Sequence, residues 1–188
     1  LTPEHIRKIQ AVGKKLEIIV TANEKDALKN SADVEIIAGF PSTIPPLYGA
    51  KNLTWVHSFS AGMDRVLTPE LVQSSIICSN SSGIHKTPIA EHVVGFILIL
   101  TRGFLKTFAN QQKRLWRKDD TITELCGKTV LIVGLGNIGG EVARLLHAFG
   151  CHVIAVSQNI RKKIVGINEL KKPSALDSFL PRADFVVN

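Results

Sequence analysis

The chain has 188 residues, of which 45% are hydrophobic and 21% charged, and its formal net charge is +7. This composition indicates one large or two small globular domains, and it excludes disordered, collagen-like and coiled-coil chains. The three cysteines are too few and too scattered for a disulfide framework or a metal site, and they fit a reducing, cytoplasmic setting. The longest apolar run, residues 93–100, is shorter than the roughly 20 residues of a bilayer span, so no membrane partner is expected.

The positive charge has two explanations. A longer chain that was trimmed could have lost acidic segments, and a first residue other than Met and an end at Asn188 within a strand-like pattern also indicate a fragment. Alternatively, an anionic ligand binds near the cations at 161–163 and 171–172. No nucleic-acid partner is expected, because the basic residues are not interleaved with aromatic ones and no helix-turn-helix or zinc-finger spacing occurs.

Residues 1–86 alternate helical and strand patterns, which predicts an α/β domain whose parallel sheet is covered on both faces. Thr2 as a cap and Pro3 at the first helical position predict a helix over residues 3–12. Shorter helices are expected over residues 24–30 and 69–73. Strands are expected over residues 16–20, 34–38, 53–57 and 76–78.

A long apolar helix is predicted to open a second domain, residues 87–188. Thr87 is the expected cap and Pro88 the first helical residue. This helix, over residues 88–101, is apolar on most faces, so we expect it to be buried between two bodies. It would connect the domains and form the contact of a homodimer. A more polar helix is expected over residues 104–116.

The strongest motif is a glycine-rich segment inside an α/β pattern. A β-branched run over residues 129–133 precedes it, and a helix that ends at Gly150 and a strand over residues 152–156 follow it. This order is typical of a Rossmann dinucleotide-binding domain. The first glycine permits the turn, the second clears space for a pyrophosphate, and the third lets the helix approach the strand. The N–H groups at the helix start would hold the phosphates.

The candidate cofactor-binding residues of this segment are Gly134, Leu135, Gly136, Asn137, Ile138 and Gly139, together with Thr87. The alternative is a tight turn that binds nothing.

The residues after the second strand bear on the choice between NAD and NADP. An acidic residue there would bind the ribose hydroxyls of NAD. The chain has Ser157 instead, and no acidic residue is near. A serine followed by cations can accept a 2′-phosphate, which favours NADP slightly, unless those cations are surface charges on a loop. The candidate residues at this end are Ser157, Gln158, Asn159 and Arg161.

Three blocks make the sequence resemble the D-isomer-specific 2-hydroxyacid dehydrogenases, which include glyoxylate/hydroxypyruvate reductases and phosphoglycerate dehydrogenases. They are SFSAGMD at 58–64, NSSGIHKTPIAEH at 80–92, and LCGKT at 125–129 with AFG at 148–150. The resemblance implies a flavodoxin-like substrate domain, formed by both ends of the chain, beside a Rossmann domain. It also implies an NAD(P)-dependent oxidoreductase that oxidises D-2-hydroxy acids and reduces 2-keto acids.

The resemblance further implies where the substrate binds. Backbone N–H groups of the loop Ser60, Ala61 and Gly62 would hold the substrate carboxylate, although the loop read alone could be a turn capped by polar groups. Gly39 and Phe40 would face the substrate, with Phe40 against its side chain; the alternative for Phe40 is a loop hydrophobe.

The family's catalytic arginine and its paired histidine and glutamate would follow Asn188, and none of the six histidines lies in the matching motif. We therefore expect no catalytic residue in this chain, which should bind ligands without turnover. Three Rossmann strands, at 129–133, 152–156 and 184–187, would leave an open sheet edge and a poorly stable fragment. The competing hypotheses are a non-catalytic, dinucleotide-sensing or corepressor-like protein and, from the charge alone, a nucleic-acid-binding module.

Overall fold

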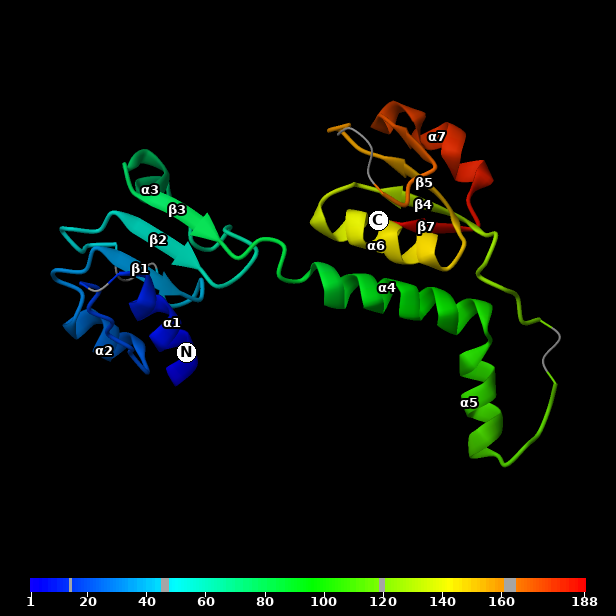
Figure 1. Cartoon of the computed structure of the whole chain (residues 1–188), viewed down its shortest axis with the longest axis horizontal. Helices are drawn as coiled ribbons and strands as arrows, with labels where there is room; N and C mark the ends of the chain where they lie inside the picture. Colours follow the sequence, from blue (N-terminus) through cyan, green and yellow to red (C-terminus); the bar gives the residue numbers. More distant parts are fainter. Residues whose placement is uncertain (14, 45–47, 119–120, 161–164) are drawn as a thin grey trace. The chain divides into compact units, whose positions relative to one another are not determined.

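The structure is a computed structural model that describes residues 1–13, 15–44, 48–118, 121–160 and 165–188. The chain forms two compact units, residues 1–82 and residues 83–188, and each contains its own parallel sheet (Figure 1). The predicted α/β class with parallel sheets is confirmed.

The first unit has a three-stranded sheet in the order β1-β2-β3. Its strands are β1 (Ile36–Gly39), β2 (Trp55–Ser58) and β3 (Ile77–Asn80). The register pairs Gly39 with Ser58 and Ser58 with Asn80, so the three strands end at one edge of the sheet. Each strand lies within two residues of its predicted place.

The described residues cover only one face of this sheet well, which differs from the prediction of cover on both faces. Ile37 and Val56 are buried against a cluster that includes Val66 and Leu71. On the opposite face, Ile77 is 66% exposed. The helices α1 (Pro3–Val12) and α2 (Glu24–Lys29) have no buried residue, whereas α3 (Pro69–Gln73) buries Leu71.

Local capping explains where the helices of this unit begin. The Thr2 hydroxyl accepts from the His5 N–H, and the His5 ring accepts from the Thr2 N–H, which forms a capping box at the predicted start of α1. At α2 and α3 the cap is a single bond: the Asn23 side chain accepts from the Asp26 N–H, and the Thr68 side chain accepts from the Leu71 N–H. The predicted bounds of α1 and α3 are confirmed.

The strand predicted over residues 16–20 is wrong. This segment forms no strand, and three of its four apolar side chains are exposed: Leu16 by 40%, Ile19 by 50% and Val20 by 52%. A β-branched run forms a strand only where a neighbouring strand and a packed face stabilise it. Neither is present at residues 16–20 in the described part of the chain.

The second unit has a four-stranded parallel sheet in the order β6-β5-β4-β7. Its strands are β4 (Thr129–Val133), β5 (His152–Val156), β6 (Glu169–Lys171) and β7 (Phe185–Val187). The predictions for β4 and β5 are confirmed to the residue, and β7 begins one residue late. Strand β6 was not predicted. Its one apolar residue, Leu170, gives no alternation of apolar and polar residues that would indicate a strand.

Helices cover both faces of this second sheet. Helices α4 (Lys86–Thr101) and α6 (Asn137–Ala148) pack together on one face, and α7 (Leu176–Phe179) lies on the other with the short 3-10 turns Pro173–Ala175 and Leu180–Arg182 (Figure 1). Alternate strand residues supply the two cores: Val130 and Ile132 face α4 and α6, and Leu131 faces α7.

The end of α6 has the geometry expected of a glycine stop. Gly150 follows the C-cap Phe149 with φ of 77°. Its N–H donates to the His147 carbonyl at 2.9 Å, and the Cys151 N–H donates to the Leu146 carbonyl at 3.1 Å. This pair of bonds is a Schellman motif, which leads the chain directly into β5.

Helix α4 differs from its prediction at its start and on its surface. It begins at Lys86 with His85 as N-cap and no side-chain capping bond, so Thr87 lies inside the helix and is not its cap. Ala90, Val94 and Ile97 are buried in the core that also holds α6, but Phe96 is 53% and Leu100 65% exposed. The helix is therefore buried on one face rather than on most of them.

Helix α5 (Phe104–Gln112) ends four residues before its predicted end at 116, and Arg114, with φ of 54°, lies outside helical geometry. Among the described residues, no single helix is long and apolar enough to cross a membrane; α4 and α5 reach that length and composition only as a pair, bent by 68° at their junction.

Candidate functional site

The glycine-rich segment joins β4 to α6 in the second unit. Gly134 directly follows β4, and its φ of 100° is a conformation that side chains disfavour. Its N–H donates to the Val156 carbonyl at 2.9 Å, so the turn is fixed to the end of β5. The Leu135 side chain packs against the core that α4 and α6 share, so the loop is also anchored by an apolar contact.

The third glycine is required by a close approach of the helix to the strand. A Cβ on Gly139 would lie 2.1 Å from the Gly134 carbonyl oxygen and 3.3 Å from Ile132 Cγ2. At Gly136, by contrast, a Cβ would meet no atom within 4 Å. The segment therefore packs tightly at one glycine and leaves open space at the other, as a pyrophosphate-binding turn requires.

The start of α6 is suited to an anion. Gly136 is the N-cap and offers no side-chain cap, and the first turn has no acidic residue. The N–H groups of a first helical turn lack partners within the helix, and the helix dipole adds positive potential there. Asn137 and Ile138 are the first residues of this turn, and both are exposed.

The start of α4 lies beside the start of α6. A Cβ on Gly83 would be 3.3 Å from Asn137 Nδ2. The pKa of Glu141 is lowered mainly by its hydrogen bonds from Arg144, with a further contribution from the charge of Lys86. Thr87, the next residue along α4, is exposed. The second unit thus brings this predicted residue to the same end as the glycine-rich segment.

Ser157 lies at the same edge of the sheet, because it follows Val156, the register partner of Val133. It is 9% exposed; its N–H donates to the Lys171 carbonyl at 3.0 Å, and its hydroxyl donates to the Asn159 carbonyl at 3.3 Å. Gln158 and Asn159 are exposed. Arg161 lies outside the described residues. The exposed Lys171 ends β6 beside Ser157, a proximity that the sequence did not predict because β6 was missed.

The predicted substrate-binding residues of the first unit meet at the carboxyl edge of its sheet. The Phe59 N–H donates to the Gly39 carbonyl at 2.8 Å, and the rings of Phe40 and Phe59 meet edge to face with centroids 5.7 Å apart. Phe40 is 59% exposed. Two chain segments, after β1 and after β2, therefore form one surface.

The loop after β2 presents backbone donors at this surface. The Ser60 N–H is bound by the Ser58 hydroxyl oxygen at 3.2 Å. Within the described part of the chain, the N–H groups of Ala61 and Gly62 donate no hydrogen bond. Adjacent backbone N–H groups of this kind bind anions.

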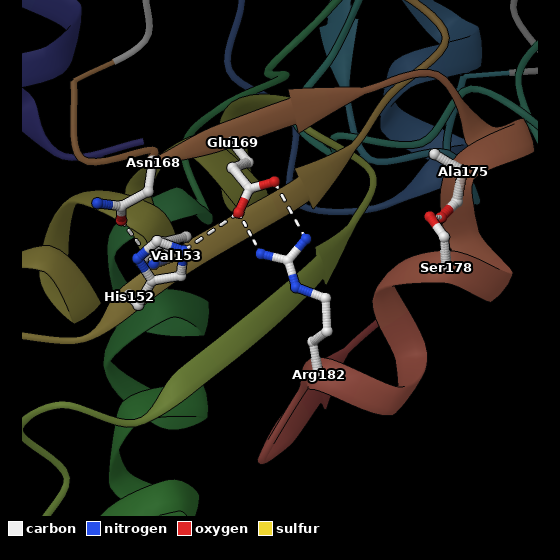
Figure 2. Close-up of polar contacts among 7 residues, drawn as sticks. All are labelled: His152, Val153, Asn168, Glu169, Ala175, Ser178 and Arg182. Atoms are coloured by element: carbon white, nitrogen blue, oxygen red, sulfur yellow. Dashed lines mark hydrogen bonds and ion pairs between the residues drawn. The ribbon is translucent and has the colours of Figure 1, made fainter.

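A charged cluster lies at the opposite edge of the second sheet (Figure 2). Arg182 donates to both oxygens of Glu169, at 3.1 Å for Nη1 to Oε2, and His152 Nε2 lies 3.4 Å from Glu169 Oε1. These hydrogen bonds, the Arg182 bond foremost, lower the pKa of Glu169 to about 2. His152 and Glu169 begin β5 and β6, so the cluster ties strands together far along the sheet from the glycine-rich segment. It is a structural contact.

Among the described residues, no group of three or more His, Cys, Asp or Glu side chains could hold a metal ion.

The family model "D-isomer specific 2-hydroxyacid dehydrogenase, NAD binding domain" matches residues 94–188. A D-3-phosphoglycerate dehydrogenase from Mycobacterium leprae is 30% identical over 180 residues, 90% of this chain and 31% of that protein. A glyoxylate reductase from Thermofilum pendens is 27% identical, over 90% of this chain and 50% of that protein. The chain thus spans a third to a half of the length of these relatives.

Two solved structures share the fold. A D-isomer specific 2-hydroxyacid dehydrogenase family protein from Aeromonas salmonicida has a TM-score of 0.86 at 30% identity, covering 97% of this chain and 59% of its own. An NADPH-dependent glyoxylate/hydroxypyruvate reductase from Sinorhizobium meliloti, in complex with NADP and sulfate, has a TM-score of 0.73 at 27% identity, covering 98% and 58%. With the glycine-rich segment and the two parallel sheets, these matches show that the chain belongs to the D-isomer specific 2-hydroxyacid dehydrogenase family.

Proposed function

We propose that this chain is part of an NAD(P)-dependent oxidoreductase that interconverts D-2-hydroxy acids and 2-keto acids. Residues 83–188 would bind the dinucleotide as a Rossmann domain, and residues 1–82 would hold the acid as part of a flavodoxin-like domain. The observation that carries the proposal is the approach of Gly139 to the Gly134 carbonyl, where a Cβ would be only 2.1 Å away. An ordinary strand-to-helix turn needs no such contact.

The proposed dinucleotide site consists of the glycine-rich segment and the start of α4. The N–H groups at the start of α6 would bind the pyrophosphate, and the open space at Gly136 would admit it. Thr87, at the start of α4, would contact the nicotinamide half. When bound, the dinucleotide supplies or accepts the hydride, while the chain's own residues provide binding, orientation and charge.

We propose NADP rather than NAD as the preferred carrier. The positions that would bind the adenosine ribose, Ser157, Gln158 and Asn159, carry no negative charge to repel a 2′-phosphate. Lys171 adds a cation at the adjacent strand end. The proposal extends to Arg161 from the sequence alone.

The carboxylate of the substrate would bind the N–H groups of Ala61 and Gly62, with Gly39 and Phe40 on the other side of it. Two N–H donors that need no rearrangement favour an anion over water, because their orientation is already fixed. The exposed ring of Phe40 would contact the substituent on the 2-carbon of the acid.

Kinetics on the full-length protein to which this chain would belong, called the intact protein below, test the function. Oxidation of NADPH and of NADH is followed by absorbance with glyoxylate, hydroxypyruvate and pyruvate, beside calorimetric titration of both carriers without substrate. We expect binding of NADPH and turnover of at least one acid. Binding without turnover of any 2-keto acid would support the corepressor-like alternative, and no binding would reject both.

We also propose that α4 forms a homodimer contact. Its face away from α6 exposes Ile89 by 39%, Phe96 by 53% and Leu100 by 65%. Exposed apolar side chains grouped on one helix are typical of subunit interfaces.

A further inference from the structure

The peptide units that carry the two backbone donors of the proposed carboxylate site are hydrogen-bonded by the last residue of β3 and by the residue after it. We propose that Asn80 and Ser81 are positioning residues, which fix the direction of the Ala61 and Gly62 N–H groups by binding the carbonyls on the same peptide units. This inference rests on the proposed function for its ligand class, a carboxylate. Its geometry comes from hydrogen bonds within the first unit.

Each of the two peptide units is held by its carbonyl. The Ser60 carbonyl accepts from the Ser81 N–H at 3.2 Å, and the Ala61 carbonyl accepts from Asn80 Nδ2 at 2.5 Å. In a planar trans peptide the N–H points away from the C=O, and the described structure has no cis peptide bond. The N–H groups of Ala61 and Gly62 therefore both point away from the chain at Asn80 and Ser81.

The Asn80 carboxamide is itself fixed at both ends. Besides its bond to Ala61, its Oδ1 accepts from the Ser82 N–H at 3.3 Å. Asn80 is the last residue of β3, paired in register with Ser58 of β2. The side chain thus reaches the loop from a strand end, which allows it little freedom, and it is only partly exposed.

Ser81 is fixed by a chain of side-chain bonds that begins at Trp55. Trp55 Nε1 donates to the Ser79 hydroxyl at 2.7 Å, and that hydroxyl lies 2.9 Å from His57 Nδ1. His57 Nε2 lies 3.3 Å from the Ser81 hydroxyl, which donates to the Ser58 carbonyl at 3.1 Å. Every donor in this series of hydrogen bonds has an acceptor if His57 carries its proton on Nε2.

The consequence is a pair of donors whose direction is set before a ligand binds. Successive N–H groups that point to one side make an anion-binding concavity. Without the bond from Asn80, the Ala61–Gly62 peptide would be free to rotate, and binding would have to restrict it again. The expected signature is weaker binding of the acid with little change in the rate of the bound complex.

The test uses the intact protein with pyruvate as the carboxylate probe. Asn80→Ala removes the donor, and Asn80→Asp keeps the size of the side chain but places an acceptor against the Ala61 carbonyl. Asn30→Ala is the matched control, because Asn30 Nδ2 also donates to a backbone carbonyl, that of Asp26 at 2.8 Å, within another element. We expect KM to rise about 10-fold for Asn80→Ala, a loss of about 1.4 kcal/mol, and more for Asn80→Asp, with kcat and the Kd for NADPH nearly unchanged. Asn30→Ala should leave KM unchanged.

Nuclear magnetic resonance separates this inference from the proposed function. In the wild type, the Ala61 and Gly62 amides should shift on titration with pyruvate and exchange with solvent faster than those of Phe59 and Ser81. These shifts and exchange rates are expected even if no acid is turned over. In that case the proposed function is wrong and the inference about Asn80 and Ser81 stands. Unshifted or protected Ala61 and Gly62 amides overturn the inference whether or not the variants fold, as does an Asn80→Ala protein that binds pyruvate like the wild type.

Discussion

Gly139 lies against the backbone of Gly134, and a Cβ on Gly139 would be 2.1 Å from the Gly134 carbonyl oxygen. No side chain can be accommodated there without moving the loop or the helix, because the contact is with backbone. The same segment leaves the neighbouring Gly140 open, since a Cβ there would meet no atom within 4 Å.

These neighbours make a matched pair of substitutions. Gly139→Ala should lower the free energy of unfolding by about 1–3 kcal/mol, the usual cost of overpacking, and should weaken binding of NADPH. Gly140→Ala should be neutral or stabilising by about 0.5–1 kcal/mol, because glycine loses more conformational freedom than alanine when the helix forms. Thermal melts and NADPH titrations of both variants check this. Equal stability of the two would contradict the packing described.

The second prediction concerns the ribose end of the dinucleotide site. Ser157→Asp should weaken NADPH binding by about 10-fold or more and improve NADH binding, because a carboxylate repels a 2′-phosphate and accepts ribose hydroxyls. Calorimetric titration with each carrier measures the change. Ser174→Asp, at an exposed position, adds the same charge and should alter neither Kd. An unchanged ratio of the two Kd values in Ser157→Asp would show that this residue does not face the ribose.

The third prediction is a pH dependence of stability. Arg182 and, to a lesser degree, His152 lower the pKa of Glu169 from 4.5 to about 2. A lowered pKa stabilises the folded state above pH 4.5, and this contribution is lost as the pH falls from there towards 2. Glu169→Gln lacks this contribution, so its free energy of unfolding by denaturant at pH 6 should be lower than that of the wild type. The difference between the two proteins should shrink by pH 3.

Glu124→Gln is the control for that experiment. Glu124 is an exposed glutamate of the same unit and makes no ion pair within the described residues. Its stability curve should follow that of the wild type across the range. If Glu169→Gln also follows the wild type, the contact between Glu169 and Arg182 in Figure 2 contributes nothing to stability in solution.

The fourth prediction tests the proposed homodimer. Phe96→Glu places a charge on the face of α4 that does not pack on α6, and we expect the intact protein to become monomeric in light scattering at micromolar concentration. Val72→Glu, on α3 and 66% exposed, should leave the mass unchanged. A monomeric wild type would contradict the proposed homodimer, and a dimer that tolerates Phe96→Glu would show that its contact does not involve this face of α4.

Local chemistry explains which elements the sequence predicts well. The strand, glycine turn and helix from Thr129 to Gly150 carry their signals within a few residues: a β-branched run, glycines at fixed spacing and a glycine stop. The capped helix α1 is similar. Strand β6 was missed because it contains a single apolar residue, Leu170, and is held by its neighbour β5. Residues 16–20 show the reverse, a strand composition without a partner strand.

The candidate site also has residues that the sequence predicts and residues that it does not. The glycine-rich segment and Ser157 follow from sequence, since they lie next to one another along a known pattern. Asn80 and Ser81 were missed as functional residues because their partners, Ala61 and Ser60, are 19 and 21 residues away and meet them only through the parallel pairing of β2 and β3. A signal was present: polar residues directly after an apolar strand lie at the edge where sites form.

Beside the close approach of Gly139 to Gly134, the proposed dinucleotide site needs the open space at Gly136, which would admit a pyrophosphate. Titration of the intact protein with NADPH, followed by nicotinamide fluorescence, should show saturable binding that Gly136→Asp abolishes without lowering the melting temperature, because the new side chain has room but repels the phosphates. Binding of NADPH that is equally tight in Gly136→Asp, or no binding of NADPH or NADH to the wild type, would contradict it.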